Sequence, residues 1–287
     1  MVAMSKQVEA KSWSMPSSLA ALDPVLHALE TLLVRLAPVR LAVSGGVDSM
    51  TLAILAGRVL GPRATMIHAV SPAVPSEATD RVRRVSMCER WNLQLVDAGE
   101  FSDESYLSNP YDRCFYCKSN LYRSIMALEH GTILSGTNLD DLGDYRPGLQ
   151  AASDHGVQHP FVVCKADKDT VRALCHYLGY PEIAQLPASP CLASRVETGI
   201  RIKAGALSFA HQVEREISEA VQANIVRCRI RPDSVVVELD AVTFGAVPED
   251  ERTIWERRIA NLARENGLPT LVRFEPYRRG SAFVQSP

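Results

Sequence analysis

A short segment rich in serine and glycine, Ser44-Gly45-Gly46-Val47-Asp48-Ser49, carries the strongest chemical signal in the sequence. It follows an apolar run and precedes a helical pattern, so we expect a turn between a buried strand and a helix. Glycine lets the backbone approach a ligand closely, and a helix N-terminus presents free N–H groups to an anion. The segment predicts a phosphate-binding loop in which Ser44 and Ser49 add hydroxyls, while Asp48 holds Mg²⁺ or orients the loop.

Three cysteines could share a second site. Cys114 and Cys117 form a C-x-x-C pair that we expect just before a helix, and Cys191 falls in a loop after a later helix. Three thiolates are too few for a structural zinc site, which takes four ligands. They can hold a [4Fe–4S] cluster and leave one iron open. The alternative is a redox pair at Cys114 and Cys117, with Cys191 as a separate nucleophile.

Neighbouring charges and the places of the other four cysteines set Cys114, Cys117 and Cys191 apart as candidate site residues. Positive side chains next to the three cysteines favour the thiolate in either interpretation; they are Arg113, Lys118 and Arg195. The other cysteines fall inside expected helices or strands, where free cysteine acts as a small core residue. They are Cys88, Cys164, Cys175 and Cys228.

Alternating strands and helices must position these groups. The patterns predict strands over 40–44, 64–70, 93–98 and 132–135, and helices over 19–36, 47–60, 76–91, 116–130 and 167–178. This order predicts an α/β fold with a parallel sheet covered by helices on both faces. Loops at the carboxyl ends of parallel strands line the ligand crevice. The glycine loop, the segment 134–141 and the cysteines should therefore lie at one end of the sheet.

The pattern changes after about residue 200. Helices over 203–221 and 248–266 and strands over 225–230, 235–239 and 270–274 predict a smaller α+β domain. We therefore divide the chain into an N-terminal tail and helix (1–37), an α/β domain (38–200) and a C-terminal α+β domain (201–287).

Composition narrows the function classes. The 287 residues include 31 Lys and Arg against 33 Asp and Glu, a formal charge of −2, so nucleic acid is an improbable partner. No apolar run is long enough to span a membrane, and no charged segment leads into an apolar core as in a signal peptide. Seven cysteines, an odd number, do not suggest a disulfide framework. We expect a cytoplasmic protein with reduced thiols.

The glycine loop resembles the SGGxDS pyrophosphate loop of the PP-loop ATP pyrophosphatase superfamily at all six positions, 44–49. Enzymes of this superfamily cut ATP between the α and β phosphates and adenylate a substrate oxygen. The resemblance implies that residues 44–49 bind ATP and that Gly136 and Thr137 lie near the nucleotide. Asp140 and Asp141, in the same second loop, are as well explained by capping of a turn.

Three further segments resemble the LarE family of ATP-dependent sulfur transferases. They are 143–151, 167–174 and 190–195, and the resemblance covers roughly residues 38–280. It implies a homo-oligomer that adenylates the carboxylates of a pyridinium-3,5-dicarboxylate mononucleotide and converts them to thiocarboxylates for the nickel-pincer nucleotide cofactor. Members with one cysteine, matching Cys191, give up its sulfur. Members with an upstream C-x-x-C hold a [4Fe–4S] cluster whose extra sulfide is the donor. With Cys114, Cys117 and Cys191, this chain resembles the cluster type.

The resemblance also implies a substrate site. Arg227 and Arg229 match a pair that binds the substrate phosphate, and residues two apart on a strand share a face. Ser194 and Arg195 follow Cys191 closely enough to contact the substrate, and Glu214 matches an acidic helix position near it.

Other PP-loop functions remain as alternatives. A tRNA thiolase can also hold a three-cysteine cluster, but it usually needs a basic face, and residues 201–287 carry 13 basic and 12 acidic side chains. An amidotransferase or synthetase would use ammonia and need no cysteine triad. A nucleotide-binding sensor with a redox cluster would bind ATP without releasing pyrophosphate.

Overall fold

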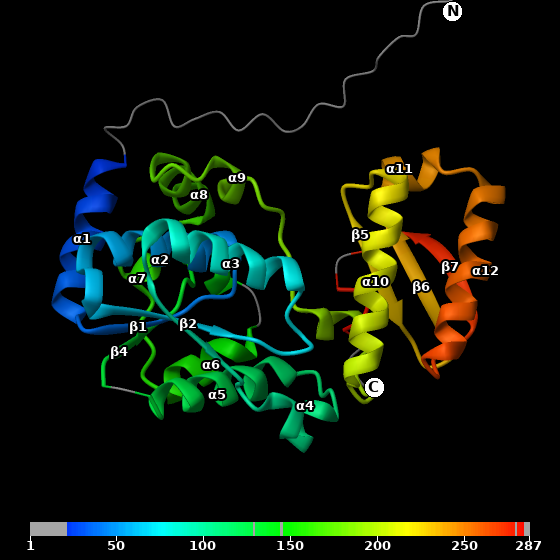
Figure 1. The fold of residues 1–287 in the computed structure, drawn as a ribbon, viewed down its shortest axis with the longest axis horizontal. Coiled ribbons are helices and arrows are strands. Elements are labelled where there is room, and N and C mark those ends of the chain that lie inside the picture. The colour runs from blue at the N-terminus through cyan, green and yellow to red at the C-terminus, as the bar shows by residue number, and fades with distance from the viewer. Residues whose placement is uncertain (1–21, 129, 144–145, 279, 284–287) are drawn as a thin grey trace, which may run out of the picture.

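The computed structural model describes residues 22–128, 130–143, 146–278 and 280–283. Within these residues, a four-stranded sheet and a three-stranded sheet form two parts of the molecule that lie side by side (Figure 1). The α/β fold predicted from the sequence, with helices on both faces of a parallel sheet, is confirmed.

The first sheet is parallel throughout. Its strands are β1 (Val39–Ala42), β2 (Ala64–Ala69), β3 (Asn92–Val96) and β4 (Thr132–Leu134). The strand order is β3-β2-β1-β4, so β1 is flanked by β2 and β4, and every residue of β1 is buried. Burial on both faces explains the apolar residues of this strand, and its one charged residue, Arg40, donates to the carbonyl oxygens of Ile125 and Gly131.

Helices cover the two faces of this sheet unequally. One face packs against α1 (Asp23–Leu36), α2 (Val47–Leu60), α3 (Ser76–Glu89), α7 (Pro160–Val163), α8 (Lys168–Tyr177) and α9 (Pro181–Ala184). The other face packs against α5 (Arg113–Met126), which follows the short α4 (Glu104–Leu107), and against α6 (Pro147–Asp154). Successive strand residues alternate between the two cores, with Leu41 in the first and Ala42 in the second.

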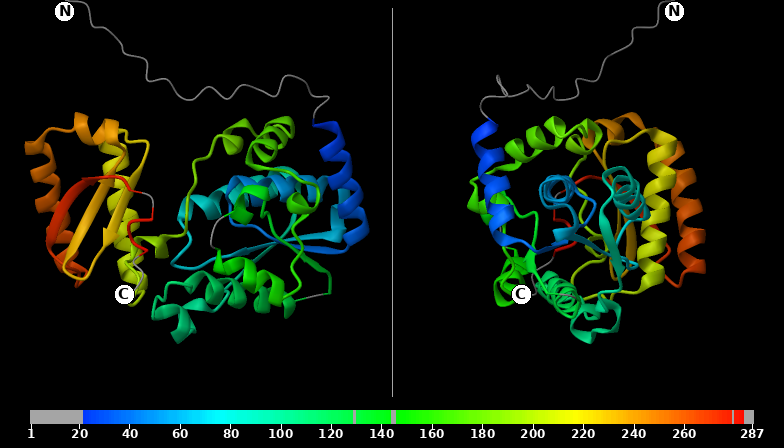
Figure 2. Two further views of the ribbon diagram at one scale, coloured as in Figure 1. Left: turned by 180° about the vertical axis from the view of Figure 1, so that it is seen from behind. Right: turned by 60° about the vertical axis from the view of Figure 1, so that its left-hand side comes forward.

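The second sheet is mixed. Strand β5 (Val226–Ile230) pairs antiparallel with β6 (Ser234–Leu239), which pairs parallel with β7 (Leu271–Pro276). Two long helices, α10 (Ala204–Val221) and α12 (Glu249–Glu265), contribute to its core, and α11 (Ala241–Ala246) follows β6 (Figure 2).

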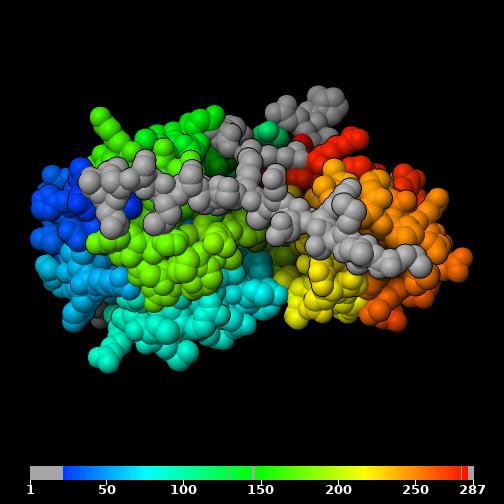
Figure 3. Space-filling model, turned by 90° about the horizontal axis from the view of Figure 1, so that it is seen from above, coloured from blue at the N-terminus to red at the C-terminus, as the bar shows by residue number. Residues whose placement is uncertain are grey.

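The two parts of the molecule pack against each other, as Figure 3 shows from above. Ala73, Tyr106 and Leu107, from the first part of the chain, belong to the core of the second sheet. Ion pairs cross the same boundary. Glu77 of α3 lies 3.0 Å from Nε2 of His211 on α10, and Arg201 lies 2.6 Å from Glu104.

Two sequence predictions about cysteines are corrected. The helix expected from residue 116 begins at Arg113, so Cys114 and Cys117 lie on α5 and not before it. Its first turn, residues 113–116, contains no aliphatic residue, so the apolar pattern detects the helix one turn late. Cys88 is not a core residue but is exposed on α3, and Cys164 is half-buried, whereas Cys175 and Cys228 are buried as predicted.

Other differences concern the helix boundaries and the short helices. The helix expected from residue 19 begins at Asp23, and residues 1–21 lie outside the described part of the chain. Three short helices that the sequence did not predict, α6, α7 and α9, begin with proline, which is favoured in a first helical turn. They are too short to show a periodic apolar pattern. Among the described residues, no helix has the length and apolar character to span a membrane.

Candidate active site

The predicted phosphate loop joins the carboxyl end of β1 to α2. Gly45 has a φ of +83°, and a Cβ atom at this position would lie only 2.9 Å from the carbonyl oxygen of Ala78. The backbone of α3 therefore excludes any larger residue here. Gly46 precedes the first turn of α2, where the leading N–H groups have no acceptor inside the helix. The loop has the geometry of an anion site.

The two serines hold the loop together. Ser49 Oγ accepts a hydrogen bond from the Ser44 backbone N–H at 3.0 Å and donates one to the Gly46 carbonyl at 3.1 Å. The two hydroxyl oxygens lie 3.0 Å apart. The loop is thus organised by its own side chains before any ligand binds.

The Asp48 carboxylate is bound by two groups from later segments. Nζ of Lys168, the first residue of α8, lies 2.8 Å from Oδ1 and 2.6 Å from Oδ2. The Asn138 amide donates to Oδ1 at 3.0 Å. Sequence reasoning assigned no role to Asn138 or Lys168, although Asn138 lies in the second predicted loop and Lys168 in a segment that carried the family resemblance. Both carboxylate oxygens of Asp48 therefore contact the positively charged ammonium of Lys168.

The second predicted loop lies directly against the first. It follows β4, which pairs with β1, so both loops leave adjacent strands at the same sheet edge. A Cβ atom at Gly136 would lie 2.7 Å from the Ser49 backbone nitrogen, which leaves room only for glycine. Thr137 Oγ1 lies 3.0 Å from the Ser135 hydroxyl. The sequence therefore identified two loops that the structure brings into backbone contact.

The two aspartates of the second loop cap backbone groups. Asp140 accepts a hydrogen bond from the Lys168 backbone N–H, and Asp141 accepts one from that of Asn138, both at 3.1 Å. Asp141 also pairs with Arg146 at 2.9 Å. These contacts fit the capping interpretation of the two carboxylates.

The three candidate cysteines face a common region. Cys114 and Cys117 are half-buried on α5, and Cys191 is exposed in the segment before α10. Burial raises the pKa of Cys117 to about 12, and negative charge on Cys191 is the second cause. Burial and Cys191 likewise raise the pKa of Cys114. These charge effects indicate that Cys191 lies near both thiols, and the grouping of the three cysteines into one site stays a prediction.

Several buried polar atoms beside these cysteines have no hydrogen-bond partner among the described residues. They are Oε2 of Glu100, the Tyr106 hydroxyl, and Nε and Nη2 of Arg113, in side chains that are at most 3% exposed. Only Nη1 of Arg113 has a partner in this set, the Asn109 side-chain oxygen at 3.0 Å, and the guanidinium lies 4.4 Å from the centre of the Phe283 ring. Buried polar atoms normally have partners, so this cluster needs an explanation.

Tyr106 lies at the centre of this cluster. Burial raises its pKa far above the ordinary value, and the charges of Cys191, Cys117 and Glu100 raise it further, while Arg113 lowers it. Tyr106 also packs in the same apolar core as Cys117. Tyr106 therefore lies close to Cys117 and Cys191.

The groups around this space suit a [4Fe–4S] cluster. Three thiols supply its ligands, and buried O–H and N–H groups can donate hydrogen bonds to its sulfur atoms. Among the described residues, no three His, Cys, Asp or Glu side chains are arranged to hold a single metal ion. A four-iron cluster is larger, and its ligands need not converge on one atom.

Arg195 fixes the segment that carries Cys191. Its guanidinium forms two hydrogen bonds of 2.8 Å with the Glu214 carboxylate, in a pair that is nearly buried. Nη1 donates to the Pro190 carbonyl and to the Ser194 hydroxyl, both at 2.9 Å. Ser194, Arg195 and Glu214, which the sequence grouped around the substrate, form one network next to Cys191.

The two predicted phosphate-binding arginines differ in their surroundings. Arg229 is 4% exposed, and its Nε donates to Glu238 at 2.9 Å while Nη1 donates to the Ser194 carbonyl. Arg227 is half-buried and donates to the carbonyl oxygens of Val226 and Ala188. Among the described residues, no carboxylate lies within ion-pair distance of Arg227, so its charge remains free for an anion, whereas that of Arg229 is compensated.

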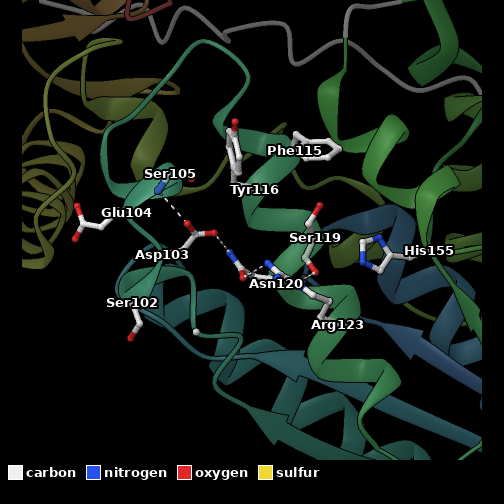
Figure 4. A pocket seen from close by; sticks show the side chains of 11 residues that line it. Ser102, Asp103, Glu104, Ser105, Phe115, Tyr116, Ser119, Asn120, Arg123 and His155 are labelled. Carbon is white, nitrogen blue, oxygen red and sulfur yellow. Dashed lines mark hydrogen bonds between the residues drawn. The ribbon is translucent and has the colours of Figure 1, made fainter.

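A cavity of about 680 Å³ lies on another face of α5 (Figure 4). It is lined by residues of the segment 99–105, by Phe115, Tyr116, Asn120 and Arg123 of α5, and by His155. Within the described part of the chain, none of the predicted site residues lines this cavity. It is therefore separate from the candidate site.

Comparisons with known proteins identify relatives of this chain. An uncharacterized protein of Synechocystis sp. is 32% identical over 217 residues, which make up 71% of this chain and 81% of that protein. The chain belongs to the same family. A pyridinium-3,5-bisthiocarboxylic acid mononucleotide synthase of Lactiplantibacillus plantarum is 28% identical over 212 residues, 72% of this chain and 76% of the synthase. This relationship supports the LarE family that the motifs indicated.

An archaeal relative extends the comparison. An uncharacterized protein of Methanocaldococcus jannaschii is 25% identical over 219 residues, 75% of this chain and 82% of that protein. No family model matches the chain. The support for the LarE family thus comes from individual relatives and from the motifs.

Proposed function

We propose that this chain is an ATP-dependent sulfurtransferase of the LarE type. It converts the carboxylates of a pyridinium-3,5-dicarboxylate mononucleotide to thiocarboxylates, in keeping with the name of its Lactiplantibacillus relative. The observation that carries the proposal is the meeting of an SGGVDS loop with three mutually interacting cysteines in one fold. A nucleotide-binding protein without sulfur chemistry would not need the second feature.

The reaction has two stages at each carboxylate. The substrate carboxylate attacks the α-phosphorus of ATP, the bond to the β-phosphate oxygen breaks, and pyrophosphate leaves. A sulfur nucleophile then attacks the acyl-adenylate and displaces AMP, so that one oxygen is replaced by sulfur. In this proposal the loop 44–49 binds the phosphates of ATP, with Gly136 and Thr137 beside the nucleotide and Mg²⁺ accompanying it.

The cysteines supply the sulfur site. In this proposal Cys114, Cys117 and Cys191 ligate a [4Fe–4S] cluster, which when bound offers a replaceable sulfide as the sulfur source. The buried donors of Tyr106 and Arg113 support this assignment, since they have no partner among the described residues. Arg113 would also place a buried positive charge beside the anionic cluster that these cysteines hold in the proposal.

The substrate phosphate is assigned to Arg227. Its charge has no carboxylate within ion-pair distance among the described residues. Glu214 and Arg195 act on Cys191 through the backbone carbonyls that Arg195 binds, so they are positioning residues in this proposal.

The test uses anaerobically reconstituted protein with ATP, Mg²⁺ and the pyridinium dicarboxylate mononucleotide. We expect pyrophosphate release that depends on the mononucleotide, and a product in which mass spectrometry detects sulfur in place of oxygen. Cys117→Ser should lose iron and sulfur transfer, and Cys88→Ser, at an exposed position outside the site, should lose neither. Pyrophosphate release with unmodified tRNA alone would instead identify a tRNA thiolase. Sulfur transfer by iron-free protein would identify Cys191 as the sulfur source.

A further inference from the structure

Asn109 is a fully buried polar residue in the turn between α4 and α5. Its amide nitrogen donates to the carbonyl oxygen of Glu197 at 2.8 Å and to that of Ile200 at 2.9 Å. Its side-chain oxygen accepts a hydrogen bond of 3.0 Å from Nη1 of Arg113, in the first turn of α5. One side chain therefore joins the start of the cysteine-bearing helix to a segment that follows Cys191 in the chain.

The chemistry of the partners fixes the orientation of this amide. An arginine can only donate a hydrogen bond and a backbone carbonyl can only accept one, so the oxygen faces Arg113 and the nitrogen faces Glu197 and Ile200. The backbone of Asn109 binds the same segment, because its carbonyl accepts from the Gly199 N–H at 2.9 Å. Its φ of +56° is a left-handed conformation that asparagine adopts more readily than most residues. Asparagine therefore suits both the hydrogen bonds and the backbone here.

The segment that Asn109 binds continues the one that carries Cys191. Cys191 precedes the short turn Leu192–Arg195, and Glu197 follows soon after that turn. The second sheet holds the same segment from another side, since the Glu197 N–H donates to the Ile230 carbonyl at 3.0 Å. The position of Cys191 thus depends on contacts with both parts of the molecule.

Other hydrogen bonds of this segment to the first part of the chain do not involve α5. The Leu192 N–H donates to the Ala73 carbonyl, and the Ile202 N–H donates to the Leu107 carbonyl, both at 2.9 Å. Asn109 differs from these contacts because its side chain also binds the first turn of the helix that carries the C-x-x-C pair. It is therefore placed to set the position of the Cys191 segment relative to that helix.

We propose that Asn109 is a positioning residue that holds the Cys191 segment where Cys114, Cys117 and Cys191 can ligate one [4Fe–4S] cluster. Ligands from distant segments converge on one group only if both segments are fixed, and partners behind the ligands supply that rigidity. By binding Nη1 of Arg113, Asn109 also leaves Nε and Nη2, which have no partner among the described residues, available to the cluster. This inference rests on the proposed function and adds a residue that supports the cluster without ligating it.

The rate of iron release from reconstituted protein into excess bipyridine, followed by absorbance, tests the proposal. Asn109→Gly removes the side chain, and glycine adopts the left-handed backbone without strain. We expect iron release to be about tenfold faster or more, because partners that orient metal ligands contribute to metal affinity on this scale. The electron paramagnetic resonance spectrum of the reduced cluster should change as well, which a general loss of stability would not cause.

Arg40→Met is the matched control. Arg40 is also a buried donor to backbone carbonyls of a distant segment, and one of them, that of Ile125, lies at the opposite end of α5. This variant should release iron at the wild-type rate, even if the urea unfolding midpoint of the cluster-free protein falls. The same midpoint is measured for each Asn109 variant, so that iron release is compared between proteins of known stability.

Asn109→Asp is a second variant that conserves the side-chain volume. It keeps the oxygen that faces Arg113 but places another oxygen against the carbonyls of Glu197 and Ile200, so it should also lose iron faster than the wild type. It decides the question if Asn109→Gly does not fold.

Three results would overturn the inference and leave the proposed function standing. They are wild-type iron release in either folded Asn109 variant, equally fast release from Arg40→Met at the same unfolding midpoint, and failure of both Asn109 variants to fold, since Asn109 would then serve the fold as a whole. A wild-type protein that takes up no iron on reconstitution would instead overturn the proposed cluster, and this inference with it.

Discussion

The loop 44–49 and the cysteine region, which surrounds Cys114, Cys117 and Cys191, differ in how completely their polar atoms are hydrogen-bonded. In the loop, Ser44 and Ser49 bond each other and the backbone, and Asp48 is bound by Lys168 and Asn138. Beside the cysteines, by contrast, buried polar atoms of three side chains have no partner among the described residues.

This difference indicates two kinds of ligand. A loop whose side chains bond one another is stable when empty, as a site for a nucleotide that binds and leaves must be. A buried region with unsatisfied donors is costly when empty, since each such group carries a desolvation penalty of about 1–3 kcal/mol. It is the environment of a group that stays bound. The predictions below test this contrast from the largest expected effect to the smallest.

Gly136→Ala should disrupt the nucleotide loop most strongly. The added methyl would meet the Ser49 nitrogen and the Asp48 carbonyl carbon at 2.7 Å, and both belong to the backbone of α2. We expect a loss of about 1–3 kcal/mol in the free energy of unfolding and loss of ATP binding. Urea denaturation and calorimetry measure the two effects. Gly143→Ala is the control, because no described atom lies within 4 Å of its added methyl; equal behaviour of the two variants would contradict the steric argument.

The cysteine region should make the cluster-free protein sensitive to alkaline pH. Burial and the nearby Cys191 raise the pKa of Cys117 to about 12 in the folded protein, against about 8.5 for an unfolded thiol. The unfolded state therefore loses its proton first. The contribution of Cys117 to stability is complete below about pH 8.5 and declines as the pH rises toward 12, by at most about 1.4 kcal/mol per pH unit. Urea denaturation between pH 8 and 9.5 should show a shallower decline for Cys117→Ser, and an identical slope would refute this.

Tyr106→Phe should have opposite effects on the cluster-free protein and on the protein reconstituted with the cluster. The hydroxyl has no partner among the described residues, so removing it should leave the cluster-free protein equally stable or more stable by about 1 kcal/mol. The reconstituted protein should retain less iron, because a donor to the cluster is lost. Tyr180→Phe is a contrasting control that loses a hydrogen bond of 2.6 Å to Glu89 and should destabilise the protein. Tyr106→Phe with lower cluster-free stability would show that the hydroxyl is already satisfied.

Arg123→Ala should have the smallest effect. Its guanidinium donates to the Asn120 side chain at the exposed cavity on another face of α5 (Figure 4). The free energy of unfolding should change by less than about 0.5 kcal/mol, and pyrophosphate affinity and iron content should match the wild type. A loss of iron would show that this face of α5 also supports the cluster.

Local sequence was sufficient for the loops and the fold class. The phosphate loop, its flanking strand and helix, and the second loop at Gly136 could be predicted because glycine, serine and apolar runs act within a few residues. The same holds for the C-x-x-C pair, although a first turn without aliphatic residues hid the true start of α5. In each case the signal lay inside one element.

Long-range pairing could not be predicted in this way. The bond of Asp48 to Lys168, and the compensation of Arg229 by Glu238, depend on side chains that only the folded chain brings together. Sequence reasoning gave Arg227 and Arg229 the same role, because residues two apart on a strand lie on the same face. The register of β5 and β6 puts Glu238 directly opposite Arg227, yet the carboxylate of Glu238 binds Arg229, so the difference arises from the direction of the side chains and not from the register. Tyr106 and Glu100 gave no sequence signal, because a tyrosine inside a short helix and a glutamate a few residues before it are ordinary.

The backbone contact between Gly136 and Ser49 also has a consequence for protein synthesis. A ribosome that has released only the first 130 residues has already produced the whole SGGVDS sequence. The emerging chain still lacks β4, the second loop and Lys168, so it has the motif without the groups that surround it in the folded protein. Under the proposed function, ATP would stabilise the fold only after more than half of the protein had been translated.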